Sequence, residues 1–153
     1  MQILELMKEA NTLLQQILEA TLQERSYLRA RNLDAFAQCV DHKELLIHSL
    51  ETNHDTRSSW VKNRGNEFSR SGFLSAIADL KDKAAIEQEL SAMESLLGEC
   101  KRQTDINNTV VGRTLSVTTK YLDILKGHQQ DKQVYSPSGK ATHHAASHVL
   151  GKA

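Results

Sequence analysis

Four glutamates, Glu87, Glu89, Glu94 and Glu99, lie close together and could in principle do acid–base chemistry. Such chemistry needs a pair of groups held in a pocket that tunes their pKa values. The spacing of these four is instead typical of a solvated helix face. The sequence also contains no GxxxxGK, GxGxxG, HExxH or CxxC string. We therefore predict that the protein is not an enzyme and needs no cofactor.

Three histidines, His143, His144 and His148, have a spacing that could bind a metal ion. On a helix, residues 144 and 148 would share one face and could chelate a transition metal. No acid or thiol accompanies them, and the surrounding segment offers no framework to fix them. We interpret them as ordinary histidines of a tail and predict no metal site.

Three polar residues interrupt apolar helical patterns. Lys43 can pack its aliphatic stem while its ammonium reaches a carboxylate or solvent. Thr104 and Asn107 break an apolar seam, and polar residues in such a seam usually set helix register or partner number. We predict structural roles for all three.

The composition determines which elements can carry these residues. Of 153 residues, 39% are apolar and 5% aromatic, and Pro137 is the one proline, which is typical of long helices. The 19 basic and 19 acidic side chains are interspersed, so no field favours nucleic acid or an anionic membrane. No apolar run reaches the roughly 20 residues of a membrane span. With no signal-peptide pattern and two separate thiols, Cys39 and Cys100, we predict a cytoplasmic protein.

Two helices are predicted in the first half of the chain. The first should run from Ile3 to about Leu28, with Thr21 and Glu24 on its apolar line. Asn32 can cap a second helix, so we expect a tight turn there, with a continuous helix as the alternative. The line of the second helix that should face the core consists of Leu33, Phe36, Val40, Lys43, Ile47, Leu50 and His54. Gly65 should end it, and a short helix should follow within residues 66–80.

The strongest pattern predicts a third long helix of about 45 residues. Its seam follows alternating spacings of four and three: Ile86, Leu90, Met93, Leu97, Cys100, Thr104, Asn107 and Val111. The pattern resumes at Leu115 after one residue of phase slip, so a bend or break near residues 107–112 is possible. The helix could outrun its partners and expose a second apolar stripe with Val110, Leu122 and Leu125. This stripe could be core, a homo-oligomer seam or a surface for a foreign partner.

We therefore predict an all-α fold, an antiparallel helical bundle or coiled coil of long helices with a weakly structured C-terminal tail. The helical domain should cover residues 1–126 and the flexible tail residues 127–153. After Gly127 the sequence has too few apolar residues to fold alone.

The order of these features resembles the FlgN-type flagellar export chaperones. The resemblance rests on segments 28–36 and 43–50, on the Asn-rich segment 107–111, and on segment 121–127 followed by 134–139, which contains a Tyr-x-x-x-Gly motif. It covers most of the chain except residues 66–80. Thr109 stands where the family pattern has a glycine.

The resemblance implies a cytoplasmic type III export chaperone that binds hook-filament junction proteins and delivers them to the cytoplasmic domain of the flagellar export gate. It implies a client-binding surface of Val110, Val111, Leu115, Thr118, Tyr121, Leu122 and Leu125. It also implies a gate-docking motif of Tyr135, Pro137 and Gly139. The chaperone would be a monomer or weak homo-oligomer that neither binds nucleic acid nor inserts into a membrane. The alternative is a homo-oligomeric coiled-coil adaptor without a role in secretion.

Overall fold

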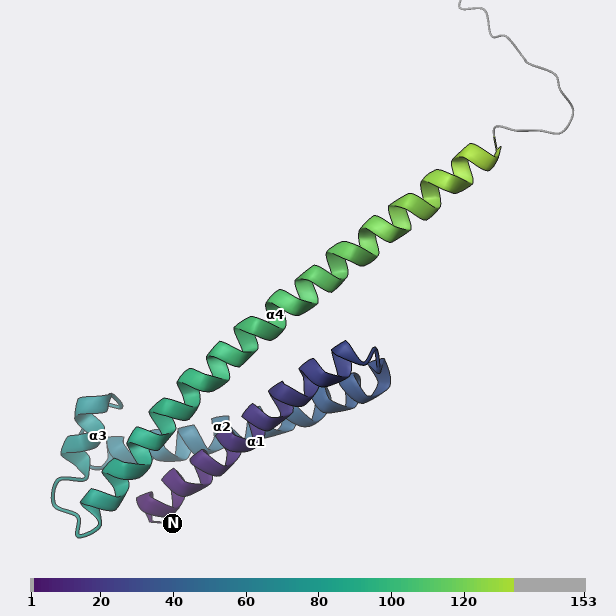
Figure 1. The fold of residues 1–153 in the computed structure, drawn as a ribbon. Coiled ribbons are helices and arrows are strands. Elements are labelled where there is room, and N and C mark those ends of the chain that lie inside the picture. The colour runs from purple at the N-terminus through teal and green to yellow at the C-terminus, as the bar shows by residue number, and fades with distance from the viewer. Residues whose placement is uncertain (1, 134–153) are drawn as a thin grey trace, which may run out of the picture. The chain divides into compact units, whose positions relative to one another are not determined.

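A computed structural model describes the backbone of residues 2–133 and the side chains of residues 2–112. The described part is all-helical, with the elements α1 (Ile3–Arg29), α2 (Leu33–Asn63), α3 (Arg70–Ala76) and α4 (Lys83–Gln133). Figure 1 shows α1 and α2 side by side, joined by a short turn at one end. Contacts between residues 6 and 53, 24 and 43, 57 and 93, and 21 and 107 show that the long helices run up, down and up. The predicted all-α, antiparallel arrangement is confirmed.

The core is built on one face of α1, as the sequence predicts. Met7 and Ala10 have no exposed surface, and Leu14 is 2% exposed. Each fully buried aliphatic side chain contributes about 1.5–3 kcal/mol relative to an exposed one. Thr21 and Glu24 continue the same line and are also buried. The polar end of this line therefore lies in the interior, next to α2 and α4.

The turn between α1 and α2 is tight, so the continuous-helix alternative is wrong. Asn32 is the N-cap of α2 and accepts a hydrogen bond from the Ala35 amide at 3.1 Å. Arg31 has a positive φ of 56°. The Asn32 amide donates to the Tyr27 carbonyl oxygen across it, as in a Schellman C-cap. An arginine thus occupies a backbone conformation that favours glycine.

The register of α2 differs from the predicted one. Leu33, Ile47 and His54 are exposed, whereas Asn53 and Arg57 are buried. The sequence offers two overlapping lines of residues, and the packed line includes these two polar side chains. They are accommodated because they bond to each other and to neighbouring helices: Arg57 Nε donates to Asn53 Oδ1 at 2.7 Å, and Asn53 Nδ2 donates to the Leu6 carbonyl oxygen at 3.0 Å.

The connection from α2 to α4 closes one end of the core. Gly65 has a φ of 77° and follows the last turn of α2, as expected of a helix-ending glycine. The predicted short helix is present as α3, with Ser69 as its N-cap. Phe73 and Ile77 of this connection are buried with Val61. Gly72 is required because a Cβ there would lie 2.0 Å from the Glu67 carbonyl oxygen.

The last helix, α4, is a single helix of 51 residues. The helix continues through residues 107–112, so the possible bend or break there is absent. It also continues beyond Gly127, the residue after which we expected a tail. Its core line also differs from the predicted seam. Ile86, Leu90, Met93, Cys100 and Asn107 are buried as expected, but Leu97 and Thr104 are exposed and Gln103 is buried instead.

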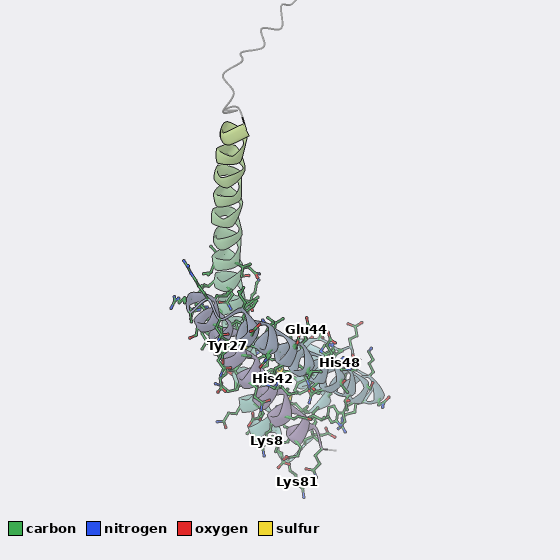
Figure 2. All side chains as sticks on the ribbon, turned by 90° about the vertical axis from the view of Figure 1, so that its right-hand side faces the viewer. Lys8, Tyr27, His42, Glu44, His48 and Lys81 are labelled. Atoms are coloured by element: carbon green, nitrogen blue, oxygen red, sulfur yellow. The ribbon has the colours of Figure 1, made fainter. Side chains whose placement is uncertain are left out.

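The chain divides into two compact units, Met1–Arg113 and Thr114–Ala153. The first contains α1, α2, α3 and the first part of α4, and its core and side chains are those described above. Figure 2 shows its side chains, with Lys8, His42 and Glu44 among the exposed ones. Within the second unit, the structure describes the helical backbone as far as Gln133. None of the described helices combines the length and apolar character of a membrane span.

Candidate functional site

The seam between α1 and α4 changes from apolar to polar near residue 103. The buried residues before this point include Leu90, Met93 and Cys100 of α4, whereas Gln103 and Asn107 follow on the same side. Together with Glu24 and Arg25 of α1 and Lys43 of α2, these two residues form a cluster that we call the polar layer. It directly precedes the segment to which the sequence assigned client binding.

Asn107 is the centre of the polar layer. It is 5% exposed, and its amide nitrogen donates to the Thr21 carbonyl oxygen at 2.7 Å and to Glu24 Oε2 at 3.3 Å. Its amide oxygen accepts a hydrogen bond from Arg25 Nε at 2.9 Å. Every side-chain polar atom of this buried amide therefore has a partner. A shift of α4 by one turn would leave these groups unpaired, so Asn107 fixes the register of α4 on α1, the role predicted for it.

A second set of bonds extends the polar layer along α4. Arg25 Nη2 donates to Gln103 Oε1 at 2.5 Å, and Gln103 Nε2 donates to Glu99 Oε1 at 2.8 Å. Glu99 also accepts two hydrogen bonds from Arg102, at 2.6 and 2.9 Å. The hydrogen bonds from Arg102 and Gln103 lower the pKa of Glu99, and Glu99 raises the pKa of Arg102. Glu99 thus acts as an ionised hydrogen-bond acceptor.

Lys43 connects α2 to the polar layer. Its ammonium lies 2.5 Å from Glu24 Oε1, and the two side chains are 17% and 6% exposed. Of the two partners predicted for the Lys43 ammonium, a carboxylate or solvent, the structure shows the carboxylate. The same carboxylate lies near Cys39, whose pKa is raised first by burial and then by the negative charge of Glu24. Cys39 and Cys100 are both free thiols, as predicted, and both are buried.

The sequence-predicted client-binding residues lie just after the polar layer. Val110 and Val111 are half-buried. The side chains of Leu115, Thr118, Tyr121, Leu122 and Leu125 lie outside the described residues, although the backbone is helical at all five positions. The gate-docking residues Tyr135, Pro137 and Gly139 lie outside the described residues, as do the three tail histidines. The four glutamates first considered for catalysis all lie on α4, where Glu94 pairs with Arg70 and Glu89 accepts a hydrogen bond from Asn11.

Sequence reasoning missed two features of the first unit. Gln103 and Arg25 were not expected in the polar layer, although Glu24 and Asn107 on facing apolar lines indicated that polar partners were needed. Asn53 and Arg57 were not expected in the interior, because a buried arginine has no periodic signature of its own. A line of polar residues every three to four positions on α2 was the signal available.

These observations define the class of protein: an all-α bundle whose last long helix is fixed by a polar layer and then continues for a further 20 residues after Arg113. A family model described as FlgN protein matches residues 1–143. The chain therefore belongs to the FlgN family of flagellar export chaperones. Searches of curated proteins and of solved structures gave no significant match.

Proposed function

We propose that this chaperone binds hook-filament junction proteins on the α4 face formed by residues 110–125 and presents them, in the cytoplasm, to the export gate. Family membership supports the general role in flagellar export. The observation that carries the location is that α4 remains one helix through Gly112 to Gln133. Positions 111, 115, 118, 122 and 125 then recur every three or four residues on one helix face.

Such a face suits a helical client. A client segment with a heptad pattern can add its own apolar stripe to the α4 stripe, without nucleotide or cofactor. The polar layer is consistent with separate roles for the bundle and the client face, because the hydrogen bonds of Asn107 hold α4 on α1 just before the proposed surface begins along the chain. The bundle would then hold α4 in place while residues 110–125 bind the client.

The client face can be tested with matched aspartate substitutions on α4. Leu122→Asp and Leu125→Asp place a charge on the proposed face, whereas Ile124→Asp makes a similar change on the opposite side of the helix. Losing a buried leucine and burying a charge should weaken client binding by about 3 kcal/mol or more, roughly a hundredfold. Titration calorimetry with purified hook-filament junction proteins measures this, with circular dichroism to verify helicity. Wild-type affinity in both leucine variants would refute the proposed surface.

Gate docking is proposed for the tail motif of Tyr135, Pro137 and Gly139. A tyrosine offers apolar area and a hydroxyl at little entropic cost, which suits brief capture by a partner. Tyr135→Ala should weaken binding to the cytoplasmic domain of the export gate while client affinity stays unchanged, and Ser136→Ala should change neither. Equal gate binding by Tyr135→Ala and wild type would remove this motif from the proposal.

The homo-oligomeric adaptor remains the competing function. If residues 110–125 closed on a second copy, light scattering on the isolated chain would give a tight dimer, and Leu122→Asp would dissociate it. A monomer that binds its client in a one-to-one complex is the result expected of the chaperone.

A further inference from the structure

A groove runs between α2 and α4 in the first unit. We call it the α2–α4 groove; its volume is about 630 Å³, and its apolar lining includes Ile47, Leu50, Phe68, Met93 and Leu97. Ile47 and Leu97 are 39% and 46% exposed. Both belong to the apolar lines that the sequence predicted to be buried. The described residues therefore leave part of two apolar helix faces uncovered.

A buried positive charge lines this groove. Arg57 is 5% exposed, and it also lines a second cavity of about 240 Å³. Its Nε donates to Asn53 Oδ1 at 2.7 Å and its Nη1 contacts Met93 Sδ at 3.4 Å. No carboxylate within the described side chains of residues 2–112 forms a salt bridge with it. Burial lowers the pKa of Arg57, as expected of a charge without a counter-ion.

A guanidinium offers five N–H donors. Among the described residues, the Arg57 guanidinium uses two of them, one on a weak sulfur acceptor. A buried charge is costly until it is paired and hydrogen-bonded. The ideal partner for its free donors is a carboxylate, which can accept two parallel hydrogen bonds from an arginine. The groove therefore combines uncovered apolar area with an arginine that forms no salt bridge among the described residues.

The other charged residues at the groove indicate which charges its partner should carry. Glu51 and Asp55 of α2 line the groove and are exposed. Both acids precede Arg57 along α2, so they match a segment with basic residues on one side of its acid. From Ile47 to Arg57 the groove wall extends about 15 Å along α2, the length of roughly three helical turns.

We propose that the α2–α4 groove binds a helix of another protein that carries one carboxylate within its apolar stripe and basic residues on one side of that carboxylate. The carboxylate pairs with Arg57, the apolar stripe covers Ile47 and Leu97, and the basic residues face Glu51 and Asp55. This site does not depend on the proposed client face of α4.

The test uses the full chain and a designed probe. The probe is a fluorescent 14-residue helical peptide with a leucine stripe, one central glutamate and lysines at one end of the stripe. Its control carries glutamine in place of the glutamate. Fluorescence anisotropy should show that wild type binds the glutamate peptide about tenfold more tightly than the glutamine peptide. Equal binding of the two peptides would overturn the proposal.

Four variants locate the site. Arg57→Met keeps the side-chain length and should reduce the preference for glutamate to less than twofold, whereas Arg57→Lys should retain part of it. Leu97→Asp should weaken both peptides at least tenfold, and Leu45→Asp should weaken neither, because Leu45 is 68% exposed on α2 and does not line the groove. Retained preference in a folded Arg57→Met protein would overturn the proposal. So would light scattering that shows a wild-type dimer dissociated by Leu97→Asp, since a second copy would then be the occupant.

Discussion

Asn107 gives the sharpest test of how α4 is held. Asn107→Ala removes three side-chain hydrogen bonds, to Thr21, Glu24 and Arg25, from a residue that is 5% exposed. Bonds to charged groups contribute about 1.5–3 kcal/mol each and neutral ones about 1 kcal/mol. Glu24 keeps Lys43 and Arg25 keeps Gln103 as partners, so the full sum will not be lost. We expect a destabilisation of about 2–3 kcal/mol.

Urea unfolding followed by circular dichroism measures this change, and the denaturant slope should stay the same if the native state is otherwise intact. For a chain of this size the same loss lowers the melting temperature by about 6–10 °C. Asn108→Ala is the matched control, because Asn108 is the adjacent residue and is exposed. If the two variants differed by less than about 0.5 kcal/mol, the polar layer would not be what holds α4.

Three further predictions follow from the backbone and the thiols. Arg31→Gly should stabilise the protein by about 0.5–1 kcal/mol, because the left-handed backbone conformation of Arg31 costs more free energy than the extra entropy that glycine loses on folding. A lower midpoint of urea unfolding in the variant would contradict this. Gly98→Ala should stabilise the protein by about 1 kcal/mol, because a Cβ at this helical position meets no other atom, whereas Gly72→Ala should destabilise it by about 1–3 kcal/mol, because its Cβ meets the backbone. Thermal melts of the two variants measure this, and equal changes in melting temperature would be inconsistent with the described turn. Burial raises the pKa values of Cys39 and Cys100, so a thiol reagent at pH 8 should modify them only as fast as the protein opens, and instant labelling of the native chain would contradict their burial.

Much of the fold was predictable because helix periodicity and caps are local. The apolar line of α1, the cap at Asn32 and the glycine that ends α2 each follow from residues within a few positions of one another. The pairing of Lys43 with a carboxylate was predictable in kind, since a lysine on an apolar line needs a partner or solvent. The family could also be recognised from the order of short segments, and the matching family model confirms it.

The candidate site was predictable only in part. Asn107 interrupts a seam, which indicated a role in setting register or partner number, and in the structure its side chain forms three hydrogen bonds to α1. Its partners Arg25 and Gln103 could not be foreseen, because they come together only when α1 and α4 pack. The client face and the tail motif stay predictions from resemblance.

The sequence by itself determined which segments are helical, where the turns fall and which face of α1 is buried, because these depend on interactions a few residues apart. Only the tertiary structure decided which of two overlapping lines on α2 enters the core. The line with Asn53 and Arg57 is buried because Leu6, Glu9 and Met93 on other helices accept their hydrogen bonds. That choice leaves Ile47 exposed at the groove, because a helix with two overlapping lines can bury only the line that its neighbours cover.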